Sequence, residues 1–94
     1  MASVKELLYD KALLKWGLVS QLMMLAEESS ELSVSALHMT RNLKNKEKAL
    51  ESLAEEIADV QLMIDEILYY FPELPSKVAI NQAHKIKRLA EFLK

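Results

Sequence analysis

The stretch LVSQLMMLAEESSELSVSALHM, residues 18–39, decides the fold of this chain, because Leu, Met, Ala and Glu predominate in it and it contains neither Gly nor Pro. These residue types favour helix, so the stretch predicts one long helix. Its first half is apolar on nearly every side, and such a helix is buried all round. One small bundle does not easily bury it. We therefore expect a second subunit against it, with Met23 or Met24 near the contact and Trp16 at its rim.

The sequence on either side of this stretch predicts three more helices. Ser3 and Glu6 form the pattern of a capping box, which starts a helix that runs to about Trp16. Gly17, the only glycine, interrupts the chain before the second helix. After a polar connector, a third helix runs over residues 47–71 and stops at a proline. A fourth helix begins near Pro75 and continues to the C-terminus.

Composition narrows the class of protein. The chain has 94 residues with one Gly and two Pro, too few turn residues for an all-β domain. No Cys is present, which excludes disulfides and thiolate metal sites. A net charge of −2 disfavours nucleic-acid binding, and no apolar run is long enough to span a membrane. We expect a single cytoplasmic all-α domain over residues 1–94, an antiparallel four-helix bundle assembled as a homo-oligomer.

Two groups of carboxylates lie midway along the second and third helices. They are the segments Glu27-Glu28-Ser29-Ser30-Glu31 and Glu55-Glu56-Ile57-Ala58-Asp59. In each segment two acids are spaced i, i+3, so they project from one side of the helix. In an antiparallel hairpin that turns near residues 43 and 44, positions whose numbers have the same sum lie at the same height. That register pairs residue 28 with 59 and residue 31 with 56.

The four acids at this height, Glu28, Glu31, Glu56 and Asp59, have no Lys or Arg within four residues along their helices. Carboxylates that converge without basic partners must either take up protons or bind a cation. Oxygen ligands suit a hard ion, so the sequence predicts an Mg²⁺ site, with Mn²⁺ as a second choice.

The pair of motifs Glu27-Glu28-x-x-Glu31 and Glu56-x-x-Asp59 resembles the signature of the MazG-like nucleoside triphosphate pyrophosphohydrolases. The lead-in Lys15-Trp16-Gly17 with Gln21 is similar too, and the resemblance covers essentially the whole chain. It implies Mg²⁺-dependent cleavage of an NTP or dNTP to the monophosphate and pyrophosphate. It also implies that Glu28, Glu31, Glu56 and Asp59 are the metal ligands, and that Trp16 and Gln21 contact substrate.

The acid that orients the attacking water stays open between Glu27 and Glu55. The fourth helix gathers basic and amide side chains within about 100° of arc. They are Lys77, Asn81, His84, Lys85 and Arg88. By the same resemblance, Lys77, Asn81 and Lys85 contact the triphosphate, although this chain lacks the longer basic and aromatic ending that many members have. A dimer or tetramer is expected to complete the base pocket.

Two other functions compete with this interpretation. The chain is also similar to phosphoribosyl-ATP pyrophosphohydrolases, but these usually have a Lys shortly before the first acidic motif, where this chain has residues 22–26 without one. The second alternative is a helical interaction module that keeps the acids but does not turn over substrate. The sequence does not indicate the preferred base or sugar.

Overall fold

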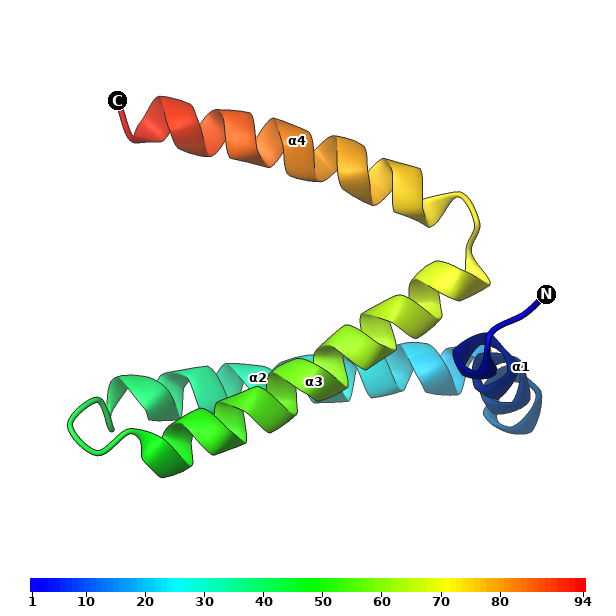
Figure 1. Cartoon of the computed structure of the whole chain (residues 1–94), viewed down its shortest axis with the longest axis horizontal. Helices are drawn as coiled ribbons and strands as arrows, with labels where there is room; N and C mark the ends of the chain where they lie inside the picture. The colour runs from blue at the N-terminus through cyan, green and yellow to red at the C-terminus, as the bar shows by residue number, and fades with distance from the viewer.

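The computed structural model describes all residues 1–94 and contains four α-helices and no strand (Figure 1). The helices are α1 (Val4–Trp16), α2 (Leu18–Thr40), α3 (Glu47–Tyr70) and α4 (Leu74–Phe92). These bounds confirm the predicted all-α class and differ from the predicted ends by one or two residues. None of the four helices combines the length and the apolar composition that a bilayer span requires.

Helix α1 starts and ends as the sequence predicts. The Ser3 backbone N–H donates to Glu6 Oε1 at 3.0 Å, and the Glu6 N–H donates to Ser3 Oγ at 3.1 Å, which completes the capping box. Gly17 lies at φ 83° and ψ 159°, and its N–H donates to the Leu13 carbonyl at 2.9 Å. That backbone conformation is open to glycine almost alone, so a single residue turns the chain from α1 into α2.

Helices α2 and α3 form the predicted antiparallel hairpin and share most of the contacts between helices. The hydroxyls of Ser35 and Ser52 lie 3.2 Å apart across the seam, which places these two residues at one height. The turn between the helices is held by Asn42, whose side-chain amide donates to the His38 carbonyl at 2.8 Å. The observed register therefore agrees with the one that pairs residue 31 with residue 56.

Helix α1 packs across the α2–α3 hairpin near the end of α3. Only eight residues of the chain are buried, and they lie in these three helices. Five are apolar or aromatic (Tyr9, Ala49, Val60, Met63 and Ile67) and three are polar or charged (Gln21, Ser35 and Glu66). The core is thus small and partly polar, since both buried residues of α2 are polar.

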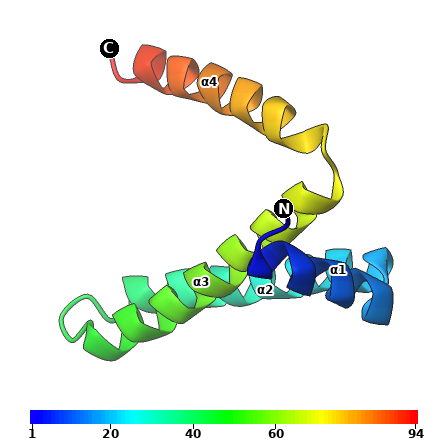
Figure 2. The ribbon, with the colours of Figure 1, turned by 45° about the vertical axis from the view of Figure 1, so that its right-hand side comes forward.

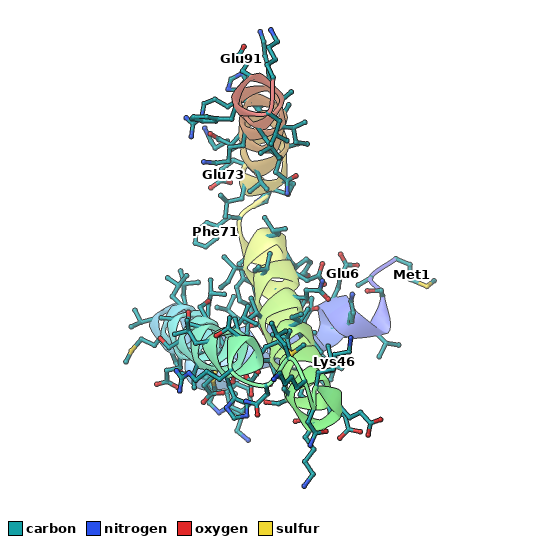
Figure 3. All side chains as sticks on the ribbon, turned by 90° about the vertical axis from the view of Figure 1, so that its left-hand side faces the viewer. Met1, Glu6, Lys46, Phe71, Glu73 and Glu91 are labelled. Atoms are coloured by element: carbon teal, nitrogen blue, oxygen red, sulfur yellow. The ribbon has the colours of Figure 1, made fainter.

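Helix α4 departs from the predicted bundle. No residue of α4 is buried, and the helix leaves the hairpin at the connection after Phe71 and stands apart from it in both ribbon views (Figures 1 and 2). Viewed nearly end-on, its side chains project on all sides without meeting α1 or α2 (Figure 3). The antiparallel bundle is thus formed in part within the single chain, by α1, α2 and α3, and α4 does not complete it. Its start lies beside α1 and α3, where Pro75 lines a hollow together with Tyr9 and Leu68.

The apolar start of α2 is uncovered in the single chain. Val19, Met23 and Met24 are exposed, as is Trp16 at the end of α1. These are the residues for which the sequence predicts a second subunit. The single chain leaves their surface to water, and the predicted contact stays a prediction.

Candidate metal centre

Three of the predicted ligands meet in the seam of the hairpin. Glu28 and Glu31 project from α2 and Glu56 projects from α3, and one oxygen of each lies within 4.8 Å of the others. The i, i+3 spacing on α2 places the first two on one side of that helix, and the hairpin register brings Glu56 level with Glu31. We refer to Glu28, Glu31 and Glu56 as the carboxylate cluster.

Two oxygens of the carboxylate cluster lack a partner. Glu28 Oε2 and Glu56 Oε2 are both shielded from solvent, and neither accepts a hydrogen bond. A charged oxygen withdrawn from water without a donor is costly, and native proteins rarely keep such atoms unpaired. A proton or a cation against these oxygens would offset that cost.

The surroundings raise the pKa of both half-buried acids above the ordinary glutamate range. For Glu28 the largest cause is desolvation, followed by the charges of Glu31, Asp59 and Glu56. The pKa of Glu56 is raised by desolvation first and then by the charges of Glu31 and Asp59. Each acid thus opposes the ionisation of its neighbours.

No basic side chain neutralises the carboxylate cluster. Helix α2 contains no Lys or Arg, and α3 contains only Lys48, near its N-terminus. The one ion pair in the chain joins Lys5 Nζ to Asp65 Oδ2 at 3.1 Å, between α1 and α3.

No family model, curated protein or solved structure matches this chain.

The fourth predicted ligand, Asp59, lies beside the cluster but outside the group of three. It is exposed, and its charge contributes to raising the pKa of both Glu28 and Glu56. The structure thus brings three of the four predicted ligands within 4.8 Å and keeps the fourth at the edge.

The two candidates for orienting water have different surroundings. Glu55 is exposed and is near enough to Glu56 for its charge to help raise the pKa of that acid. Glu27 is also exposed, but it lines a shallow hollow on the outer side of α2 with Met23 and Met24. Which of the two would orient a water stays a prediction.

A hollow of about 380 Å³ opens next to the carboxylate cluster, on the side of the hairpin turn. Its lining adds Ser30, Val34, Ser35, His38 and Ser52 to Glu31 and Glu56. We call this face of the hairpin the acidic side. The sequence interpretation missed its serines, although the register that pairs 31 with 56 also pairs 35 with 52 and could have revealed them.

The predicted substrate contacts are not gathered at the cluster within one chain. Gln21 is buried in the core at 3% exposure, whereas Trp16 is exposed with Lys15 Nζ 5.6 Å from its ring centre. Lys77, Asn81 and Lys85 lie on the detached α4, where the Asn81 side-chain amide donates to the Lys77 carbonyl at 2.8 Å. Their role toward a triphosphate stays a prediction.

Proposed function

We propose that this protein is an Mg²⁺-dependent nucleoside triphosphate pyrophosphohydrolase of the MazG-like kind. The observation that supports its metal site is the pair of buried, unpartnered oxygens, Glu28 Oε2 and Glu56 Oε2, in a cluster without a basic neighbour. The nucleotide substrate and the reaction follow from the resemblance of the two acidic motifs to those of the MazG-like enzymes. A hard divalent cation takes several carboxylate oxygens and satisfies them at once. The donor set of the cluster, oxygen only, fits Mg²⁺ or Mn²⁺.

In this proposal, some of the acidic residues bind the metal ion and another orients the attacking water. Glu28, Glu31 and Glu56 would hold the ion, with Asp59 at the edge of the site. When bound, Mg²⁺ supplies the positive charge that balances the triphosphate and the departing pyrophosphate. Glu55 would orient a water toward the α-phosphorus and take its proton. The new bond joins the water oxygen to that phosphorus, the α–β bridging bond breaks, and the products are a nucleoside monophosphate and pyrophosphate.

The first test is release of pyrophosphate from a panel of NTPs, dNTPs and phosphoribosyl-ATP, with Mg²⁺ and with EDTA. We expect pyrophosphate and the monophosphate only when Mg²⁺ is present. A preference for phosphoribosyl-ATP would favour the alternative pyrophosphohydrolase. Orthophosphate as the product would contradict the proposed reaction. If no nucleotide is turned over, the enzyme proposal is contradicted and the non-catalytic interaction module is favoured.

A second measurement reads the metal site without catalysis. Mg²⁺ relieves repulsion in the folded cluster, so it stabilises the fold by about 2.7 kcal/mol at a hundredfold excess over its Kd. Thermal melts with EDTA and with millimolar Mg²⁺ report this difference. A matched variant, Glu51→Gln, removes an exposed acid of α3, the helix that also carries Glu56. This variant should keep the Mg²⁺ response. Coincident melts of the unaltered protein would contradict the metal site.

A further inference from the structure

Two hollows of different chemistry flank the carboxylate cluster along the hairpin. The hollow on the side of the turn is polar apart from Val34, and we call it the serine hollow. A second hollow, also of about 380 Å³, lies between α1 and α3, where its lining includes Leu8, Trp16 and Leu62. We call it the Trp16 hollow. The turn and α1 lie at opposite ends of the hairpin, so the cluster stands between a polar and a largely apolar space (Figure 1).

The two hollows and the cluster follow one strip of α3. Ser52, Glu56 and Asp59 fall within about 60° of arc, and Asp59, Leu62 and Glu66 do so as well. Ten residues separate Ser52 from Leu62, a rise of about 15 Å. A nucleoside triphosphate has a polyanion at one end and an aromatic base at the other. A strip that is polar at one end and apolar at the other therefore accepts it in one direction.

The serine hollow contains a hydroxyl hydrogen that has no acceptor in the chain. Ser35 Oγ and Ser52 Oγ lie 3.2 Å apart, and neither hydroxyl has another partner. The pair has two hydrogens and shares one hydrogen bond, so one hydrogen is left over. Ser35 is 6% exposed and Ser52 lies at the surface. When the buried Ser35 donates to Ser52, the hydrogen of Ser52 is free for a ligand in the hollow.

His38 provides a second donor at the rim of the serine hollow. The side-chain amide of Asn42 donates to the His38 carbonyl at 2.8 Å and also lies 3.3 Å from His38 Nε2. An amide nitrogen only donates, so Nε2 is the acceptor and the hydrogen of the neutral imidazole is on Nδ1. Nδ1 has no partner in the chain, and His38 lines the hollow. Donors of this kind suit the oxygens of a phosphate.

Charge favours the same end of the hairpin for a polyanion. The four Lys or Arg of residues 18–70 all lie between Arg41 and Lys48, next to the serine hollow. At the other end, the Trp16 hollow contains the carboxylate of Glu66, which is 6% exposed. Of the lysines there, Lys5 is already paired with Asp65. A polyanion is attracted toward the turn and is opposed by a buried carboxylate beside α1.

We infer that the serine hollow binds the pyrophosphate end of the substrate, the β- and γ-phosphates. Ser52 and His38 donate to the phosphate oxygens, and Ser35 is a positioning residue that holds the Ser52 hydroxyl. The inference rests on the proposed function and gives the substrate a direction, with its base toward α1 and its departing pyrophosphate toward the hairpin turn.

Binding of inorganic pyrophosphate to the full chain tests the inference without catalysis. Calorimetric titrations in saturating Mg²⁺ compare the unaltered protein with Ser52→Ala, for which we expect Kd to rise about tenfold because a charge-assisted hydrogen bond is lost. Ser52→Thr keeps the hydroxyl and should bind within about threefold of the unaltered protein. The matched control is Ser33→Ala, whose exposed hydroxyl donates to the Ser29 carbonyl at 3.1 Å and lies about 160° around α2 from Ser35.

Thermal melts in Mg²⁺ without pyrophosphate show whether the metal site is intact in each variant. The inference requires an unchanged Mg²⁺ response in Ser52→Ala together with weaker binding of pyrophosphate. Loss of the Mg²⁺ response in this variant would overturn it, because Ser52 would then act on the metal site. Equal pyrophosphate affinity in Ser52→Ala and the unaltered protein would overturn it as well, and so would a loss in Ser52→Thr as large as that in Ser52→Ala.

The fluorescence of Trp16, the only Trp of the chain, tests the direction. We expect nucleoside monophosphates in Mg²⁺ to change the emission of Trp16 and inorganic pyrophosphate to leave it unchanged. Ser52→Ala should not alter the response to the monophosphates. A change of emission with pyrophosphate, together with none for any monophosphate, would overturn the direction.

The outcomes also separate this inference from the proposed function. In an active enzyme, Ser52→Ala should weaken product inhibition by pyrophosphate about tenfold, matching the change in Kd. Turnover with product inhibition unaltered in this variant would overturn the inference and leave the proposed function standing. Pyrophosphate binding that weakens as expected, with no turnover of any nucleotide, would contradict the proposed function and support the serine hollow as a diphosphate site.

Discussion

At the scale of single residues, Glu28 and Glu56 are the groups whose position demands an explanation. Each is half-buried, and each has one oxygen that is shielded from solvent and has no hydrogen-bond donor against it. A structural salt bridge would bring a Lys or Arg to these oxygens, and the two helices provide none there. In the proposed function, a bound cation would account for their raised pKa values and for their convergence with Glu31 beside the adjacent hollow.

Substitution of one oxygen separates the metal role from a structural one. We predict that Glu56→Gln abolishes pyrophosphate release at saturating Mg²⁺ and leaves the metal-free protein at least as stable as before. The amide removes a ligand charge and also removes repulsion from Glu31. Activity and EDTA-treated melts of the same preparation measure the two effects. Retained activity would exclude Glu56 from the catalytic site.

The raised pKa values of Glu28 and Glu56 predict a pH dependence of the metal-free fold. Between the ordinary and the raised pKa the folded chain binds more protons than the unfolded chain. The stability from these acids is therefore present below the ordinary value and is lost as the pH rises through the raised value. Urea unfolding in EDTA from mildly acidic to neutral pH measures the slope, which Glu28→Gln should flatten. A slope unchanged in that variant would contradict the assignment.

At the scale of helices, three tyrosines join α1 to α3. The Tyr9 hydroxyl donates to Asp65 Oδ2 at 2.6 Å, and burial together with this bond raises the pKa of Tyr9 to about 12. The Tyr70 hydroxyl lies 2.7 Å from both the Tyr9 carbonyl and Glu66 Oε2. Its single hydrogen thus serves two acceptors, one of them on a glutamate that is only 6% exposed. These contacts orient α1 across the end of α3.

Removing the Tyr70 hydroxyl tests the contact between α1 and α3. We predict that Tyr70→Phe lowers the free energy of unfolding by about 1–3 kcal/mol, because a buried carboxylate and a carbonyl lose their donor. The comparison is Tyr69→Phe, which deletes a solvent-exposed bond to Asp10 and should cost less. Denaturant melts of both variants give the difference. An equal loss in the two variants would show that burial of Glu66 is not what makes the Tyr70 bond matter.

Gly17 connects α1 to α2, and we predict that its substitution destabilises the fold through the backbone conformation alone. A Cβ there would meet no atom within 4 Å, yet φ is +83°, so the strain in Gly17→Ala comes from the backbone alone. We expect Gly17→Ala to lower the free energy of unfolding by about 1–3 kcal/mol. A synthetic chain with D-alanine at the same position should be as stable as the glycine protein, because the mirror-image residue adopts this conformation freely. Equal stability of the two alanine proteins would contradict the strain.

At the scale of the whole molecule, local patterns predicted most of the elements and part of the site. The capping box, Gly17 and the prolines define the helix ends, and the fixed rise of a helix with a short connector determines which residues of α2 and α3 are level. That register led to Glu28, Glu31 and Glu56, and it is supported by the contact between Ser35 and Ser52.

The direction of α4 was not predictable in the same way. The amphipathic pattern of α4 indicates that the helix needs a partner face but not which face, and three connecting residues permit several directions. Burial of Gln21 and Glu66 was not predicted either, although Glu66 finds its donor in Tyr70, four residues further along the same helix.

The detached α4 has a consequence for hydrogen exchange. Because none of its side chains is buried in its own chain, its opening costs the rest of the fold almost nothing, and a 19-residue helix alone is marginally stable in water. In dilute solution its amides should exchange with deuterium nearly as fast as those of an unfolded peptide, while amides around Val60 and Ile67 exchange slowly. Raising the protein concentration should slow exchange in α4 first. Amide exchange along α4 thus measures directly whether another element covers this helix in solution.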